Sequence, residues 1–385
     1  MTAMRDVFIV GAGQTPVGEH WDLGLRELGA AAIRAALDDA GIETVDALFA
    51  GNMLGGAVNG QENLGALLAD AAGLLPAEAW KVEAACASGG AAVRAAAMAV
   101  GAGAHDVAVA VGIEKMTDAL SERVTAGLAA AADGDYEASH GLSFVALSAL
   151  LMRRYMHETG AGREDFAPFA VNAHRNAASN ANAMFRTPIS AADFARSPLV
   201  AAPIGVLDAA PVCDGAAAVV VCSREALRPA HRAVRIAAAA AATDTIGLAR
   251  RADLLTLGAA RRSAEKAFAA SGFAPGDCDL FEAHDAFTII TALSLEACGF
   301  APRGEALKRA AHGCFGRGGC IPVSTCGGLK ARGHPVGASG AYQIVEAAAQ
   351  LRGEAGPNQV TGARVALTQS IGGHGSIAVT HLLEA

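Results

Sequence analysis

Cys86 is the residue whose neighbours most strongly suggest covalent chemistry. Ser88, Gly89 and Gly90 follow it, and an alanine-rich run over residues 91–100 comes next, which predicts that Cys86 lies in the first turn of a buried helix. Free N–H groups and the positive end of the helix dipole would favour a thiolate over a thiol there. The glycines would let a thioester approach the backbone closely. The alternative is a small buried cysteine at a tight strand-to-helix junction.

Two histidines and a glycine pair complete a set of residues that suits acyl transfer. His284 lies in a His-Asp-Ala-Phe segment, His334 lies between a glycine and a proline, and Gly372 and Gly373 follow Ser370 near the carboxy-terminal end. A cysteine with two histidines supplies a nucleophile, a base that deprotonates it, and a hydrogen-bond donor for a thioester oxyanion. The glycine pair offers N–H groups for a second oxyanion site. Taken alone, a histidine at the end of a strand is more often a structural residue.

The composition argues against several other classes of protein. A net charge of −8 and a pI of 5.8 argue against a nucleic-acid surface, and 5% aromatic residues argue against base-stacking platforms. Charged residues interrupt the alanine tracts before they reach a membrane-spanning length, and the amino terminus lacks the apolar core of a signal peptide. The eight cysteines have no paired spacing, which predicts reduced thiols and a cytoplasmic location. We therefore expect no nucleic-acid partner and no membrane association.

Strand and helix patterns alternate along the first half of the chain. Residues 6–13, 45–51 and 107–112 are predicted strands, and an apolar stripe over residues 25–40 predicts a helix that ends at Gly41. The glycine turn after the first strand lacks the third glycine of a dinucleotide-binding fingerprint. We therefore interpret that turn as structural.

The second half of the chain repeats this order. A helix near residues 264–271 precedes a strand at residues 278–284, in which Asp279 matches Asp46, and residues 333–340 open another alanine-rich helix. Two matched halves of alternating strands and helices predict an α/β fold with two mostly parallel sheets. Alanine permits close helix packing, so central helices are expected between the sheets in a five-layered arrangement. A coincidental repeat of alanine-rich helices is the alternative.

The repeat would bring the helix starts at Cys86 and His334 together across a pseudo-twofold axis, at the strand ends where α/β sheets bind ligands. Residues 116–200 have no counterpart in the second half and are expected to form an inserted cap, with helices near residues 147–157 and 166–180. The predicted division is an N-terminal half, an inserted cap and a C-terminal half, formed by residues 1–115 with 201–225, residues 116–200, and residues 226–385.

Six segments in this order resemble those of the thiolase family, the acetyl-CoA acetyltransferases and 3-ketoacyl-CoA thiolases that make or cleave 3-ketoacyl-CoA by Claisen chemistry. The matching segments are residues 83–89, 112–116, 214–217, 284–287, 327–335 and 372–373. The His-Asp-x-Phe segment resembles the sterol-carrier-type and archaeal branch, since ordinary thiolases carry Asn-Glu-x-Phe. The resemblance covers essentially the whole chain. It implies a five-layered αβαβα fold with two pseudo-symmetric halves, mixed and mostly parallel sheets, and an inserted loop domain.

The resemblance also implies a role for each matched residue. Cys86 resembles the nucleophile that becomes acylated, and His334 resembles the base that activates it. His284 resembles the donor that polarises the second thioester. The N–H groups of Cys86 and Gly372 resemble the hole that holds the first tetrahedral intermediate. Family members use coenzyme A as a substrate, with no metal and no bound redox cofactor.

The chain departs from the family at the second catalytic cysteine, which moves the proton on the nucleophilic carbon. Ordinary thiolases place this cysteine where the chain has Ser370, and sterol-carrier-type members place it where the chain has Ala286. A serine hydroxyl is too weak an acid and base near neutral pH to replace it directly. The nearby candidates for this acid/base are Cys326 and His374.

A metal site is the other interpretation that the cysteines invite. Cys314, Cys320 and Cys326 recur every six residues beside His312. This spacing fits none of the usual zinc patterns. We expect incidental thiols in a loop and no metal.

The resulting interpretation is a homodimeric or homotetrameric acyltransferase that forms or cleaves 3-ketoacyl-CoA through an acyl-Cys86 intermediate. Two alternatives stay open: an acyltransferase with a non-CoA acceptor, and a weakly active acyl-CoA-binding subunit that needs a partner. The resemblance implies a candidate partner, since members of this branch are found with a small zinc-ribbon and OB-fold protein. The sequence leaves the acyl chain length and the direction of reaction open.

Overall fold

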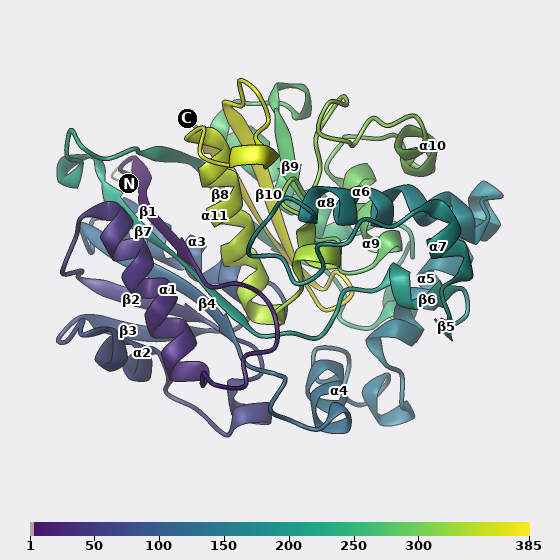
Figure 1. Cartoon of the computed structure of the whole chain (residues 1–385), viewed down its shortest axis with the longest axis horizontal. Helices are drawn as coiled ribbons and strands as arrows, with labels where there is room; N and C mark the ends of the chain where they lie inside the picture. Colours follow the sequence, from purple (N-terminus) through teal and green to yellow (C-terminus); the bar gives the residue numbers. More distant parts are fainter. Residues whose placement is uncertain (1–3) are drawn as a thin grey trace.

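Two consecutive halves of the chain build strands and helices in the same order. The computed structural model describes residues 4–385. The first half contains β1 (Val7–Gln14), α1 (Leu25–Ala40), β2 (Ala47–Gly51), α2 (Leu64–Ala72), β3 (Glu78–Val82), α3 (Ser88–Gly101), β4 (Val107–Glu114) and β7 (Gly215–Ser223). The second half contains β8 (Val234–Thr243), α8 (Gly258–Ser271), β9 (Leu280–Glu282), α9 (Thr288–Ala297), α10 (Ala306–Ala311), α11 (Ser339–Leu351), β10 (Val365–Gly372) and β11 (Ile377–Glu384). The two halves lie side by side in Figure 1.

The strands follow the order β3-β2-β4-β7-β1-β8-β11-β10-β9. The halves join where β1 pairs with β8, at Phe8 with Arg235 and at Ile9 with Val234. In the first half, β7 is antiparallel to the other strands, which are parallel to one another. In the second half, β11 is antiparallel to the others in the same way. The predicted mixed and mostly parallel arrangement is therefore confirmed for each half.

The helices form three layers around the two halves of the sheet. Helices α1 and α2 pack on the outer face of the first half, α3 and α11 lie between the halves, and α8, with α9 beside it, packs on the outer face of the second half. A separate apolar core fills each of these interfaces. The predicted five-layered αβαβα fold is confirmed.

Matching hydrogen bonds confirm the internal repeat. The Asp46 carboxylate accepts the N–H of Val107 at the start of β4, at 2.9 Å. The Asp279 carboxylate accepts the N–H of Val365 at the start of β10, also at 2.9 Å. In each half, an aspartate just before a short strand (β2 or β9) therefore accepts a hydrogen bond from the first residue of the neighbouring parallel strand (β4 or β10).

The two central helices approach so closely at Gly89 that no side chain fits at this position. A Cβ atom at Gly89 of α3 would lie 2.7 Å from the carbonyl oxygen of Gly337 and 2.9 Å from the backbone nitrogen of Ala341 in α11. Real Cβ atoms do not approach other heavy atoms at such distances in a packed interior. Glycine at position 89 therefore permits the contact between α3 and α11.

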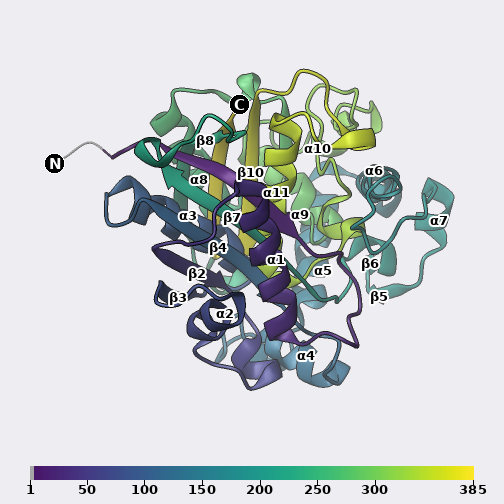
Figure 2. The same cartoon turned by 60° about the vertical axis from the view of Figure 1, so that its left-hand side comes forward.

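Four helices outside the repeat occupy residues 116–200. They are α4 (Ser121–Ala129), α5 (Phe144–Thr159), α6 (Ala167–Ala177) and α7 (Ala191–Arg196), and the short strands β5 (Leu199–Ala201) and β6 (Ile204–Gly205) follow. Figures 1 and 2 both show α5, α6 and α7 gathered at one end of the molecule. Helix α5 is held to α9 by the Tyr155 hydroxyl, which donates to Glu296 at 2.6 Å. Across residues 4–385, no helix has both the length and the apolar character needed to cross a membrane.

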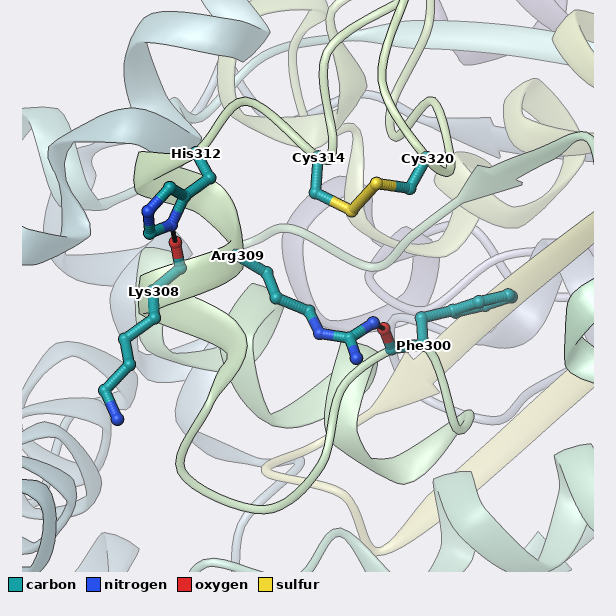
Figure 3. Close-up of a disulfide and its surroundings, with 6 residues drawn as sticks. All are labelled: Phe300, Lys308, Arg309, His312, Cys314 and Cys320. Carbon is teal, nitrogen blue, oxygen red and sulfur yellow. Dashed lines mark hydrogen bonds between the residues drawn. A yellow bond between two sulfur atoms is a disulfide. The ribbon is translucent and has the colours of Figure 1, made fainter.

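A loop after α10 contains a disulfide that we did not predict (Figure 3). Cys314 and Cys320 are bonded, with Cα atoms 4.7 Å apart, and the other six cysteines are free. The glycine-rich residues between them let the chain fold back, so that the N–H of Ile321 donates to the Cys314 carbonyl at 3.0 Å. The expectation that all eight cysteines are reduced is wrong, because spacing along the sequence does not reveal this reversal. His312 lies just before this loop, and its Nδ1 is 2.7 Å from the Lys308 carbonyl oxygen.

We expect Gly89→Ala to lower the free energy of unfolding by about 1–3 kcal/mol, because the added methyl group would overlap α11. Helix propensity alone predicts the opposite, a gain of up to about 1 kcal/mol. Denaturant titration followed by circular dichroism measures the change. Gly134→Ala is the control, since a methyl group there meets no atom within 4 Å. Unchanged or increased stability of Gly89→Ala would contradict the close contact.

Candidate active site

One cavity of about 220 Å³ brings together three residues that are far apart in the sequence. Cys86, His284 and His334 all line it. Most of the remaining lining is apolar and comes from both halves and from the cap, including Met116, Leu128, Phe144, Phe287, Ile290 and Val336. The predicted convergence of the cysteine and the two histidines on a shared pocket is found in the structure.

Cys86 sits in a tight turn between β3 and α3. Helix α3 begins at Ser88, so Cys86 precedes the helix by two residues and does not lie in its first turn. Ala85 has a left-handed backbone with φ of 51°, an uncommon conformation for a residue with a side chain. The Ser88 hydroxyl fixes this turn, since it donates to the Ala85 carbonyl at 2.6 Å and accepts the N–H of Ala84 at 2.9 Å.

The environment of the Cys86 sulfur keeps it protonated. Burial raises the pKa of the thiol to about 12, the Glu114 carboxylate adds to the rise, and N–H groups of Cys86 and Gly373 lower it only in part. The prediction of a thiolate stabilised by the helix is therefore wrong, because loss of hydration outweighs the nearby N–H groups. The resting residue is a thiol that needs a base before it can act as a nucleophile.

His334 is held as a neutral base at the start of α11. Its Nδ1 lies 2.7 Å from the Ser339 hydroxyl, which itself donates to the Pro335 carbonyl at 3.4 Å. With the hydroxyl proton directed at Pro335, we assign the imidazole proton to Nδ1, which leaves a lone pair on Nε2. Burial, the neighbouring His284 and the Arg332 cation lower the pKa of His334 well below its usual range.

The residue before His334 must be glycine. Gly333 has a φ of 119°, and a Cβ atom there would lie 2.5 Å from the Val17 side chain and 3.1 Å from the Cys213 sulfur. Such a conformation is readily available only to glycine. The backbone can therefore pass beneath Val17 and present the imidazole to the cavity.

His284 follows β9 and meets His334 directly. The two ring centroids are 5.2 Å apart, and the ring planes stand at 87° to each other. The next residue, Asp285, accepts the N–H of Leu329 at 2.6 Å and so ties the His284 turn to the segment that leads to His334. Burial lowers the pKa of His284 to about 3. Its neutral imidazole can donate one hydrogen bond into the cavity.

Three of the four further candidates do not line this cavity. The Ser370 hydroxyl donates to the Gln343 side chain at 2.9 Å. Gly372 ends β10, and Gly373 lines the cavity in its place. Cys326 is buried elsewhere, and burial together with Glu346 and Glu282 raises the pKa of its thiol well above the usual range. The roles predicted for Ser370, Gly372 and Cys326 stay predictions.

His374 is the candidate that lines the same cavity as Cys86. Its Nε2 lies 3.0 Å from the Phe144 carbonyl and 3.1 Å from the Ser148 hydroxyl, and its ring stacks on the Phe144 ring with centroids 4.4 Å apart. A carbonyl can only accept, so Nε2 carries the proton and Nδ1 carries a lone pair. This Nδ1 is buried without a hydrogen-bond partner. Burial lowers the pKa of His374 to about 4.

Comparison with known proteins decides the family. The thiolase N-terminal domain matches residues 7–225, and the thiolase C-terminal domain-like family matches residues 240–385. The chain belongs to the thiolase family. An acetyl-CoA acetyltransferase of Methanothermobacter thermautotrophicus is 43% identical over 382 residues, which span 98% of this chain and 99% of that protein. The chain is accordingly a thiolase-type acyl-CoA C-acyltransferase.

Two further similarities concern the branch of thiolases and the fold. Sterol carrier protein 2 of Homo sapiens is 29% identical over 395 residues, which span 98% of this chain and 72% of that protein. The solved structure of an Ltp2-ChsH2(DUF35) aldolase superposes with a TM-score of 0.87 at 26% identity, over 99% of this chain and 98% of that one. Sterol-carrier-type relatives are therefore among the thiolases that this chain resembles.

A buried ion pair behind the two histidines was missed by the sequence analysis. Arg332 donates to Glu346 of α11 at 2.9 Å, and both side chains are almost completely buried. The guanidinium also stacks over the Tyr342 ring, 4.7 Å from its centroid. The ion pair anchors the segment before His334 to the same helix that holds its Nδ1. The two basic residues within the glycine-rich segment, Lys330 and Arg332, were the available sequence signal.

A second buried ion pair links two of the segments that this thiolase shares with its family. Lys115 donates to Asp214 at 2.7 Å, and the other carboxylate oxygen of Asp214 accepts the N–H of Met116 at 2.6 Å. Both charged side chains are buried. The pair therefore fixes Met116, a lining residue of the cavity, against the start of β7.

We expect the rate of Cys86 alkylation by iodoacetamide to rise about tenfold per pH unit from pH 7 to pH 10, because the reactive thiolate is scarce when the pKa is about 12. Peptide mass spectrometry after timed quenching measures the modification of Cys86. The urea-unfolded chain is the control and should react with a pKa near 8.5. A rate that levels off near neutral pH would instead indicate a thiolate–imidazolium pair.

Proposed function

We propose that this thiolase carries an acyl group on Cys86 between an acyl-CoA and either the carbon of a second acyl-CoA or free CoA. The observation that supports this role most directly is the shared cavity of Cys86, His284 and His334. A thiol, a neutral base and a neutral donor that line one cavity match the needs of covalent acyl transfer.

The first half-reaction begins with proton transfer from the Cys86 thiol to Nε2 of His334. The sulfur then attacks the thioester carbon, and the backbone N–H groups of Cys86 and of the Gly372–Gly373 turn stabilise the oxyanion. The bond from carbon to the CoA sulfur breaks. The CoA thiolate leaves with the proton that His334 returns, so both groups end the step uncharged.

The second half-reaction needs a base for the α-carbon of the incoming acyl-CoA. We assign this proton transfer to Nδ1 of His374, since Ser370 and Cys326 lie outside the cavity lining and Ala286 has no titratable group. The carbanion attacks the acyl carbon, the bond from that carbon to the Cys86 sulfur breaks, and the departing thiolate takes up the proton that His374 removed from the α-carbon, so that both residues return to their resting forms. His284 donates to the carbonyl oxygen of the second thioester as it becomes an enolate.

Coenzyme A takes part in this scheme as a substrate that enters beneath the cap. Leu128, Ser143, Phe144 and Val145 come from residues 116–200 and line the cavity.

The position of residues 116–200 over the cavity supports the proposed division into an N-terminal half of residues 1–115 with 201–225, a cap, and a C-terminal half of residues 226–385. The cytoplasmic location expected from the sequence stays a prediction.

His374→Ala should separate the two half-reactions. We expect acylation of Cys86 to persist, while formation of 3-ketoacyl-CoA and deuterium exchange at the acetyl-CoA methyl group fall about 10²–10⁴-fold, the usual contribution of a general acid or base. Intact mass spectrometry follows acylation, and NMR in D₂O follows the exchange.

Two further variants make this test selective. Cys86→Ala should lose acylation itself. His381→Ala is the matched control, because this histidine is equally buried but lies on β11, outside the cavity lining. Equal loss of both half-reactions in His374→Ala, or no loss, would contradict the assignment.

The expected homodimer is proposed to form through the edge strand β3. This strand pairs with β2 on one side, and Trp80 on it is 59% exposed. Two copies of such an edge can continue one another around a twofold axis and bury both tryptophans. The homotetramer expected as an alternative would require a second interface.

Trp80→Glu should shift the protein to the monomer, because the interface would bury two unpaired carboxylates. Size-exclusion chromatography with light scattering measures the mass. Trp21→Glu is the control, since Trp21 is also exposed, at 69%, but precedes α1 and is not part of β3. A dimeric Trp80→Glu protein would exclude β3 as the interface.

A DUF35-type companion with a zinc ribbon and an OB fold is also proposed, on the strength of the Ltp2-ChsH2(DUF35) structure. Activity of the chain purified alone tests whether this partner is required. Full turnover alone would remove the hypothesis of a weakly active subunit. Acylation of Cys86 without turnover to 3-ketoacyl-CoA would favour either a missing partner or a non-CoA acceptor, and adding acceptor compounds would distinguish them.

A further inference from the structure

The cavity around Cys86 carries no formal counter-ion for a charged acyl group. All nineteen residues that line it belong to the described part of the chain, and none of them is Asp, Glu, Lys or Arg. The polar lining consists of the cysteine, three histidines, Thr125 and Ser143. Burial lowers the pKa of all three histidines, so they too are uncharged near neutral pH.

The two buried arginines that lower the pKa of these histidines, Arg251 and Arg332, lie outside the cavity lining. Arg332 is paired with Glu346, whereas Arg251 donates a single hydrogen bond to the His374 carbonyl at 2.7 Å and its Nε and Nη1 are buried without a partner. Lys330 lines a different, much smaller cavity together with Asp285. A free carboxylate at the far end of the acyl group would therefore be buried without a partner, which is strongly unfavourable.

Apolar side chains surround much of Cys86. Cys86 belongs to an apolar cluster with Met116 and Val336, and Leu128 packs against this cluster. Ile290 adds a further apolar side chain to the cavity lining. Each methylene group of an acyl chain buried against such a surface improves binding by roughly fourfold, the equivalent of about 0.8 kcal/mol.

The size of the cavity leaves room for more than an acetyl group. A cavity of roughly 150 Å³ lined by aliphatic and aromatic side chains holds a benzene molecule. The cavity here has about 220 Å³. It can therefore admit the thiol end of the CoA arm together with an acyl group of several carbons.

We propose that Cys86 accepts uncharged, apolar acyl groups larger than acetyl, and that the cavity rejects acyl groups that carry a free carboxylate. This inference rests on the proposed role of Cys86 as the acyl carrier. It adds a substrate class, neutral aliphatic or aryl acyl-CoA, to the transfer reaction.

The test compares single-turnover acylation by acetyl-, hexanoyl-, benzoyl- and succinyl-CoA, measured by intact mass spectrometry and by CoA release at subsaturating substrate. We expect hexanoyl- and benzoyl-CoA to acylate the protein at least about tenfold faster than acetyl-CoA. We expect succinyl-CoA to be at least about a hundredfold slower than hexanoyl-CoA. Acetyl-CoA as the fastest substrate, or succinyl-CoA on a par with hexanoyl-CoA, would overturn the inference while leaving the proposed function intact. Failure of all four to acylate Cys86 would contradict the proposed function itself.

A variant of the cavity wall gives an independent test. Leu128→Trp should lower the ratio of hexanoyl to acetyl transfer by at least about tenfold, because the larger side chain fills acyl space, and Leu128→Ala should raise that ratio. Ala126→Trp is the matched control, since Ala126 lies on the same helix, is exposed and does not line the cavity. An unchanged ratio in both Leu128 variants would show that the acyl group lies elsewhere.

Discussion

The close contact between α3 and α11 is the constraint on which the site depends. Because glycine and alanine let the two backbones meet, the turn that carries Cys86 and the segment that carries His334 arrive at the same end of the central layer. Neither half of the chain holds a complete site. The internal repeat therefore creates the site, because Cys86 of the first half meets His284 and His334 of the second half only where the two halves are in contact.

Burial, more than proximity to charges, sets the pKa values of the titratable groups in this site. Loss of hydration raises the pKa of Cys86 and lowers the pKa of His284, His334 and His374, so every one of these groups rests in its neutral form. A neutral thiol and a neutral imidazole exchange a proton only when the reaction creates a charge that the N–H groups can hold. Proton transfer is thereby linked to the arrival of a thioester.

The sequence predicted the residues of the site better than their protonation. Cys86, His284 and His334 were identified from residue type and neighbours, and Asp46 and Asp279 revealed the repeat. By contrast, the alanine run of β8 has a helical propensity that the sheet overrides. The fold-back that joins Cys314 to Cys320, the pairing of Arg332 with Glu346 and the desolvation of Cys86 all depend on contacts between segments distant in the sequence. Local patterns carry no signal for such contacts.

The raised pKa of Cys86 also makes its sulfur harder to oxidise between turnovers. Peroxides attack the thiolate form of cysteine, and sulfenic acid formation begins the path to irreversible oxidation. A sulfur that stays protonated until a thioester and His334 act on it together is shielded from this damage. The environment that makes the nucleophile dependent on its base thus also protects it from adventitious electrophiles.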